Sequence, residues 1–131
     1  MSMPFSIRAH RWGVDRVDED AQGVTIVDFK TSQVKDQESA DKKARESLQL
    51  ELYAFAYKEI FDVLPAYLEL FFLESGVIGK IPLEDGSFSR IKDKIREVSA
   101  GVRSENFKAM PAYLACTYCA YNQICSSAKI K

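Results

Sequence analysis

The chain has 131 residues, of which 47% are hydrophobic, and its 18 basic and 19 acidic side chains give a net charge of −1. An intrinsically disordered chain is excluded, because such chains are poor in apolar residues and strongly charged. The charge balance also argues against a protein that coats nucleic acid through bulk electrostatics. No run reaches the roughly 18 apolar residues of a membrane span, and the N-terminus does not resemble a signal peptide. We therefore expect a cytoplasmic domain with no membrane partner.

The first half of the chain predicts a hairpin followed by a loop. Residues 7–17 and 23–30 have strand character, and the second segment, GVTIVDFK, is β-branched and apolar until its end. The polar segment 18–23 ends in Gly and suits the hairpin connection. Residues 31–43 are polar and show no apolar period, so they predict a loop.

A helix is predicted over residues 44–61, and Pro65 prevents its continuation. Three apolar residues form one stripe along this helix: Leu48, Leu52 and Phe55. Four more widen the stripe: Leu50, Ala54, Tyr57 and Phe61. Because apolar residues cover most sides of the helix, we expect it to be largely buried. Residues 66–73 predict an interior strand and 77–81 a shorter one. Ser87 or Ser89 can cap a last helix, whose apolar positions are Ile91, Ile95, Val98 and Val102. The order β-β-α-β-β-α predicts an α/β fold, a mixed sheet flanked by helices.

Two carboxylates and an ammonium group are candidates for chemistry. Asp28 ends the apolar strand, and Lys30 lies two residues on, so both side chains share one face. If the two strands pair, Asp15 can converge on the same point. Two acids and a backbone carbonyl form an oxygen-rich site that suits Mg²⁺ or Mn²⁺. The alternative is a plain ion pair between Asp28 and Lys30, since a buried carboxylate needs a partner.

Gln49 and Tyr53 are four residues apart and share one face of the predicted helix. Tyr53 can be an ordinary core aromatic, whereas an amide on a mostly buried helix needs a partner. Taken alone, the pair favours a structural role over a functional one.

Three ordered blocks carry a resemblance to a known family: GVDRVD at residues 13–18, IVDFKT at 26–31 and QLELY at 49–53. Together with the C-terminal cysteines, the chain resembles the PD-(D/E)XK nuclease superfamily over nearly its whole length. The closest resemblance is to the RecB-like branch, found in helicase–nucleases and in stand-alone exonucleases. The resemblance implies a restriction-endonuclease-like core.

This resemblance also implies a role for each residue. Asp15, Asp28 and the backbone carbonyl of Phe29 would ligate Mg²⁺ or Mn²⁺. Lys30 would orient the attacking water, and Gln49 and Tyr53 would contact the phosphate or support the lysine. Six residues would together form the site: Asp15, Asp28, Phe29, Lys30, Gln49 and Tyr53. The reaction would be hydrolysis of DNA phosphodiester bonds, with exonuclease action expected.

All three cysteines, Cys116, Cys119 and Cys125, lie within ten residues. An odd number of clustered thiols points away from disulfides and towards metal ligation. Three thiolates cannot complete a Cys₄ site. In iron–sulfur members of the family, a fourth Cys from upstream completes a [4Fe–4S] cluster, and this chain has none upstream. We therefore expect three free or buried thiols here and a cluster only in a longer parent protein.

We interpret the chain as a single RecB-like nuclease domain over 1–131, truncated at its N-terminus, because the family's usual first helix is missing. Its parts are a metal-site sheet with the Gln/Tyr helix (7–86), a helix (87–110) and a cysteine-containing segment (111–131). The leading hypothesis is a DNA repair or recombination nuclease joined to a helicase domain or subunit. The alternatives are an inactive module that binds DNA or braces an assembly, and a small thiolate-metal protein.

Overall fold

The computed structural model describes residues 13–84, 86 and 88–130. In chain order the elements are β1 (Arg16–Asp20), β2 (Gly23–Lys30), α2 (Gln37–Glu46), α3 (Leu48–Phe61), β3 (Tyr67–Phe72), β4 (Ile78–Pro82), α4 (Ser89–Arg103) and α5 (Tyr113–Thr117). None of the helices within these ranges combines the length and the apolar character needed to cross a bilayer.

The four strands form one mixed sheet in the order β1-β2-β3-β4. β1 and β2 are antiparallel, β2 and β3 are parallel, and β3 and β4 are antiparallel. A parallel pair needs a long crossover connection, and α2 with α3 supplies it between β2 and β3. The predicted α/β fold with flanking helices is therefore confirmed, as are the two strands predicted near residues 66–73 and 77–81.

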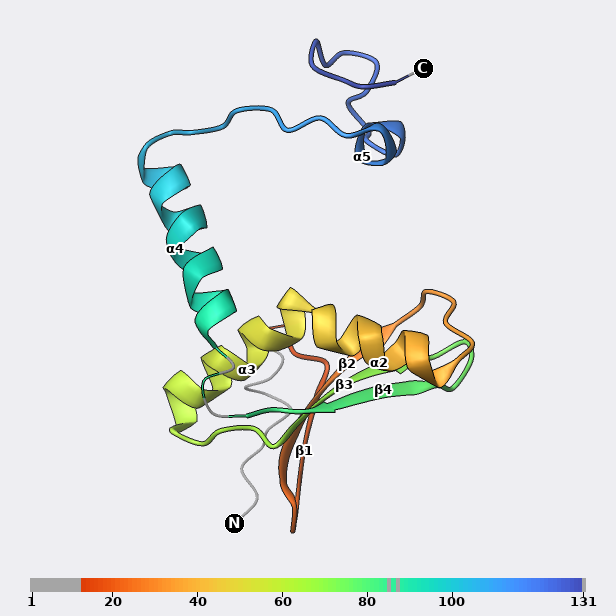
Figure 1. The fold of residues 1–131 in the computed structure, drawn as a ribbon, viewed down its shortest axis with the longest axis vertical. Helices are drawn as coiled ribbons and strands as arrows, with labels where there is room; N and C mark the ends of the chain where they lie inside the picture. Colours follow the sequence, from red (N-terminus) through yellow and green to blue (C-terminus); the bar gives the residue numbers. More distant parts are fainter. Residues whose placement is uncertain (1–12, 85, 87, 131) are drawn as a thin grey trace. The chain divides into compact units, whose positions relative to one another are not determined.

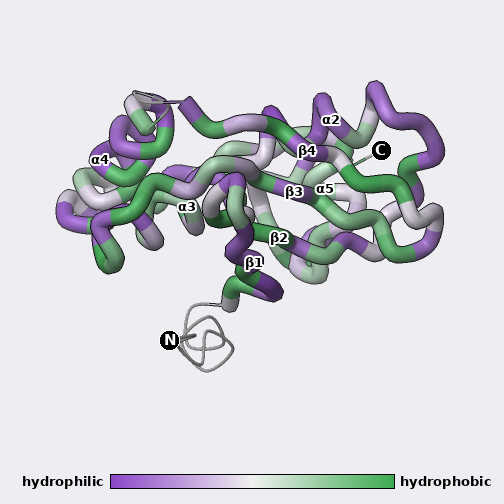
Figure 2. Tube along the Cα trace, turned by 90° about the horizontal axis from the view of Figure 1, so that it is seen from below, coloured by the Kyte–Doolittle hydropathy of each residue, from purple (hydrophilic) through white to green (hydrophobic). Residues whose placement is uncertain are grey.

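The core lies between the sheet and the two crossover helices, which cover one face of the sheet (Figure 1). The largest fully buried side chains include Ile26 from β2, Leu68 and Phe72 from β3, and Leu50 from α3. Figure 2 colours β2 mostly green and the edge strand β1 mostly purple, in line with their burial. An interior strand has neighbours on both sides and so favours apolar side chains.

The chain divides into two compact units, Met1–Lys94 and Ile95–Lys131. The first unit contains the sheet with α2 and α3, and the second contains α5 and the three cysteines. In the second unit the large apolar side chains are mostly exposed, including Phe107, Met110 and Ile124. The hairpin and the six site residues predicted between Asp15 and Tyr53 lie in the first unit.

The predicted hairpin exists, but its first strand begins later than expected. Part of segment 7–17 lies outside the described residues, and β1 starts at Arg16. The predicted connection 18–23 is wrong, because Asp18 to Asp20 pair with Gly23 to Thr25 and only Ala21 and Gln22 form the turn. These acidic residues have low strand propensity, but pairing with β2 outweighs it at an exposed edge.

The loop predicted at 31–43 is also wrong, because it contains most of α2. Asp36 caps this helix by accepting a hydrogen bond of 2.8 Å from the Ser39 backbone N–H. This bond lowers the pKa of Asp36 below its usual value. Only Ala40 and Ala44, four residues apart, are buried on α2. A stripe this narrow escapes a search for large apolar residues, although the cap and the two alanines are visible in the sequence.

The helix predicted at 44–61 is two helices that meet at Ser47. The backbone of Ser47 is extended, and its hydroxyl oxygen caps α3 by accepting a hydrogen bond of 3.2 Å from Leu50 N–H. The expectation that this helix is largely buried is wrong. Leu50, Ala54 and Tyr57 are buried, but three apolar side chains outside that face remain exposed: Leu48, Leu52 and Ile60.

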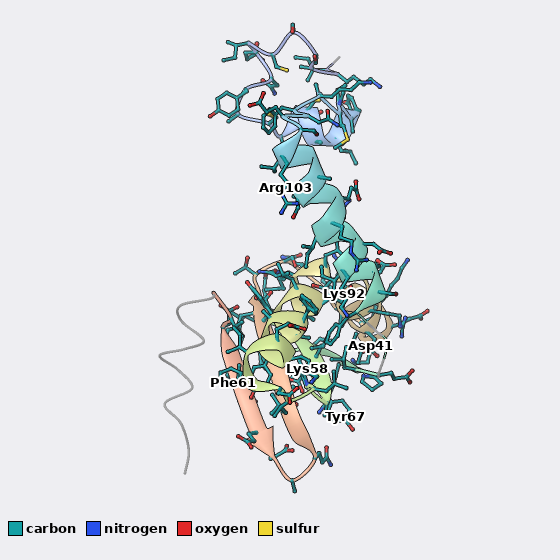
Figure 3. All side chains as sticks on the ribbon, turned by 90° about the vertical axis from the view of Figure 1, so that its left-hand side faces the viewer. Asp41, Lys58, Phe61, Tyr67, Lys92 and Arg103 are labelled. Carbon is teal, nitrogen blue, oxygen red and sulfur yellow. The ribbon has the colours of Figure 1, made fainter. Side chains whose placement is uncertain are left out.

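The start of α4 is fixed against α3 by charge and by aromatic packing. The Arg90 guanidinium forms a bidentate ion pair with Glu51, with N–O distances of 2.5 and 3.1 Å. The Phe88 and Phe55 rings pack edge-on with their centroids 5.5 Å apart. The Nζ atom of Lys92, a residue labelled in Figure 3, lies 5.7 Å from the centroid of the Phe55 ring. The helix predicted over 87–110 exists, but it spans Ser89–Arg103 and so ends earlier than predicted. Ser89 is its first helical residue and not its cap, and Ser87 lies outside the described residues.

Candidate active site

Asp28 lies near the end of β2, among side chains that exclude water. Only 3% of the residue is exposed, and Ile26 and Val27 on the same strand are fully buried. Burial raises the pKa of Asp28 above its ordinary value, because desolvation disfavours the charged carboxylate. A buried carboxylate at this position therefore needs positive charge beside it.

Lys30 supplies part of that charge from the same face of β2. Its Nζ atom lies 2.7 Å from Asp28 Oδ2. The contact is an ion pair without hydrogen-bond geometry, so Oδ2 is a buried oxygen that accepts no hydrogen bond from the described residues. Lys30 partly offsets the raised pKa of Asp28 but does not reverse it.

Asp15 reaches the same point from the segment that leads into β1. Arg16 pairs with Val27, so the next step of the antiparallel register places Asp15 beside Asp28. Asp15 Oδ2 accepts a hydrogen bond of 2.8 Å from the backbone N–H of Phe29, which fixes the carboxylate against β2. The neighbouring Asp15 carboxylate further raises the pKa of Asp28. Two carboxylates therefore lie together with a single ammonium group.

Gln49 and Tyr53 connect α3 to this group through a chain of hydrogen bonds. Lys30 Nζ donates to Gln49 Oε1 at 2.8 Å, and Gln49 Nε2 donates to the Tyr53 hydroxyl oxygen at 2.9 Å. The Tyr53 hydroxyl donates to the backbone carbonyl of Gly13 at 3.1 Å. The chain thus links β2, α3 and the segment that carries Asp15. Gln49 is exposed, so its amide forms these hydrogen bonds at the protein surface and not in the buried core.

The contacts around Lys30 leave it able to act on a ligand. An ammonium group has three N–H donors, and the contacts to Asp28 and Gln49 engage at most two of them. The side chain of Lys30 is 34% exposed, so the remaining donor can reach solvent or a bound anion.

The donor set fits one hard divalent cation. Mg²⁺ is typically bound by one or two carboxylates together with water and substrate phosphate. Asp15 and Asp28 supply two carboxylates, and the orphaned Asp28 Oδ2 leaves a buried negative oxygen to be satisfied. Within residues 13–84, 86 and 88–130, no group of three or more His, Cys, Asp or Glu side chains is placed to hold a metal. Backbone and substrate oxygens would have to complete the coordination.

The structure does not gather the three cysteines into a metal site. Cys116 is half-buried in α5, while Cys119 and Cys125 are exposed, and all three thiols are free. The Cys119 sulfur accepts a hydrogen bond of 3.4 Å from Tyr121 N–H. Three thiols do not fit a Cys₄ centre.

The sequence interpretation missed two features near the site. The Gly13 carbonyl anchors Tyr53, and only the tertiary structure shows it, because 40 residues separate the two. Lys43 and Ser47 lie beside Lys30 in a pocket. Ser47 is signalled in the sequence as a helix cap, whereas nothing distinguishes Lys43 from the neighbouring lysine at 42.

The comparisons with known proteins agree with this geometry. A family model of the PD-(D/E)XK nuclease superfamily matches residues 13–126, which include both β-strands of the hairpin, the Gln/Tyr helix and the cysteines. A comparison with curated proteins returned no match.

Proposed function

This chain belongs to the PD-(D/E)XK nuclease superfamily, and we propose that it is a RecB-like, Mg²⁺- or Mn²⁺-dependent nuclease that hydrolyses DNA phosphodiester bonds. The observation that carries the proposal is the meeting of Asp15, Asp28 and Lys30 where β1 begins and β2 ends. A structural ion pair explains Lys30 and Asp28 but gives no reason for a second carboxylate beside a buried one.

The protein residues divide the work of hydrolysis. Asp15 and Asp28, with the Phe29 carbonyl, would hold the divalent ion, which supplies Lewis-acid charge at the scissile phosphate. Lys30 would orient the attacking water with its remaining donor and stabilise charge developing on the phosphate. Gln49 would keep the Lys30 ammonium in place, and Tyr53 would fix the Asp15 segment through the Gly13 carbonyl.

The finer parts of the proposal rest on the resemblance of the three sequence blocks. We expect exonuclease action, a cytoplasmic role in DNA repair or recombination, and a helicase domain or subunit as partner. A [4Fe–4S] cluster on Cys116, Cys119 and Cys125 would need a fourth thiolate from outside this sequence. Iron and sulfide analysis of the protein purified without oxygen tests the cluster separately from the nuclease reaction.

Cleavage of linear DNA with Mn²⁺ tests the proposal. The Asp28→Ala variant should lose at least about 100-fold in rate, the scale seen when a transition-state charge partner is removed. The Glu59→Gln variant is the matched control, because Glu59 is an exposed carboxylate on α3 with no part in the site. Equal cleavage by the Asp28→Ala variant and the native chain would contradict the proposal. Stoichiometric DNA binding without cleavage would instead favour the non-catalytic module.

A further inference from the structure

A pocket of about 310 Å³ opens beside Lys30 in the first unit. Its polar lining comes from the end of β2 and the residues after it, from α2, and from the junction of α2 with α3: Lys30, Ser32, Lys43, Glu46 and Ser47. Its apolar lining comes from β3, with Leu70 and Phe72. The volume lies at the lower end of the roughly 300–1,000 Å³ of small-molecule sites. It therefore suits a group no larger than a single nucleotide.

The lining favours an anion. It carries the ammonium groups of Lys30 and Lys43 and the carboxylate of Glu46, and because Lys30 already pairs with Asp28, Lys43 supplies most of the positive charge that a ligand would meet. Lys43 forms no ion pair with any residue in the described part of the chain. The Glu51 carboxylate raises the pKa of the Arg90 guanidinium most, and the charge of Glu46 adds to it, so Glu46 interacts with a cation outside the pocket as well. A bound anion would supply the partner that Lys43 lacks.

Hydroxyl and backbone donors add to this preference. The Ser47 oxygen accepts from Leu50 N–H, which leaves its own hydroxyl proton free to be donated. Ser47 also caps the 14-residue helix α3, whose first turn has N–H groups without intrahelical acceptors. Ser32, an exposed residue, contributes a second hydroxyl group to the pocket lining.

Lys30 belongs both to the pocket and to the candidate active site. We infer that the pocket holds a second phosphate of the nucleic acid, next to the phosphate that is cleaved at Asp28 and Lys30, and that Lys43 is its main charge partner. The inference rests on the proposed function for the identity of the ligand. Lys43 would thus position the substrate strand without touching the reacting atoms.

Binding of single-stranded DNA in EDTA, followed by fluorescence anisotropy over a range of salt concentrations, measures this contact without cleavage. Lys43→Gln should weaken binding about fivefold, and the slope of log K against log salt should fall by about 0.7, the value for one phosphate contact on a single strand. The matched control is Lys42→Gln, which removes the same charge from the adjacent position outside the pocket. Equal losses in the two variants would overturn the inference.

Oligonucleotides with and without a terminal phosphate distinguish the two sources of the anion. If the terminal phosphate strengthens binding to the native chain but not to Lys43→Gln, the pocket takes a strand end. If the effect of Lys43→Gln is the same on both strands, the pocket takes an internal backbone phosphate. Both results support a second phosphate site.

An NMR titration with a deoxynucleoside monophosphate separates this inference from the nuclease proposal. Shifts at Ser32, Lys43 and Ser47 that Lys43→Gln removes, in a chain that cleaves no DNA, would support the pocket and defeat the nuclease. Metal-dependent cleavage with the same KM and the same salt slope in Lys43→Gln and the native chain would leave the nuclease and defeat the pocket.

Discussion

At the scale of single residues, burial of the Asp28 carboxylate destabilises the folded chain, and the contacts within the fold do not fully offset this. Its carboxylate is 3% exposed, its Oδ2 accepts no hydrogen bond from the described residues, and a second carboxylate lies beside it. The ammonium group of Lys30 compensates this charge in part, and it also donates a hydrogen bond to Gln49. Strained or unsatisfied groups of this kind are concentrated at functional sites, where activity outweighs stability.

The raised pKa of Asp28 predicts how stability depends on pH. Because the folded-state pKa lies above the ordinary value of 3.8, the folded chain binds this proton more tightly than the unfolded chain does. This contribution favours folding below the unfolded-state pKa and is lost as the pH rises through the folded-state pKa. The Asp28→Asn variant has no carboxyl group to titrate here, so its free energy of unfolding should not fall in this way as the pH rises. At neutral pH without metal, the variant should be more stable than the native chain.

Urea unfolding in EDTA, from acid to neutral pH, measures the effect. Lys30 keeps Gln49 as a partner in the variant, so the substitution does not strand a second charge. Glu59→Gln serves as the control, with a pH profile expected to match that of the native chain. A native chain that becomes more stable, relative to Asp28→Asn, as the pH rises through this range would contradict the prediction.

At the scale of elements, α2 positions the edge of the sheet. Gln37 Nε2 donates to the Ile78 carbonyl at 2.6 Å, and Lys80 N–H donates to Asp41 Oδ1 at 3.1 Å. These contacts satisfy backbone groups of the edge strand β4 that would otherwise be open to pairing with another chain. The side chain of Asp41 is labelled in Figure 3. The close approach depends on a residue without a side chain at position 79.

Gly79→Ala should therefore destabilise the first unit. A Cβ atom at this position would clash with the carbonyl oxygen of Ala40 and would lie 2.5 Å from the carbonyl carbon of Ala40, and these backbone atoms can move only if α2 shifts. The expected cost is about 1–3 kcal/mol in the free energy of unfolding, the range for overpacking. Urea unfolding measures it. Gly101→Ala is the control, because its Cβ would meet nothing within 4 Å and alanine favours the helix. Equal stability of the Gly79→Ala variant and the native chain would show that α2 can shift.

At the scale of the whole molecule, charge is balanced overall and uneven locally. The net charge is −1, while the candidate site gathers two carboxylates around one ammonium and the neighbouring pocket gathers two ammonium groups around one carboxylate. The first arrangement suits a divalent cation, and the second suits a phosphate. Lys30 belongs to both groups, so together they hold three carboxylates and two ammonium groups, and the net charge of the whole chain reveals neither arrangement.

A divalent ion that binds only the folded chain should stabilise the whole first unit. At a free Mn²⁺ concentration of 100 times the Kd, the gain is about 2.7 kcal/mol, which shifts the melting temperature by several degrees. Differential scanning fluorimetry measures this without any DNA. The double variant Asp15→Asn/Asp28→Asn should show no shift. An undiminished shift in that variant would place the ion elsewhere.

The sequence alone determined the mixed sheet with flanking helices and the candidate residues, because apolar periodicity and the short blocks around Asp28 and Gln49 are local signals. The predictions for β1 and α2 were wrong. Strand β1 forms by pairing at an exposed edge, and α2 is buried only through two alanines, so both elements depend on partners far along the chain. Only the tertiary structure decided which apolar stripe of α3 is buried, and that the Tyr53 hydroxyl reaches the Gly13 carbonyl. Those facts follow from how the crossover helices pack on the sheet, and a linear pattern does not contain them.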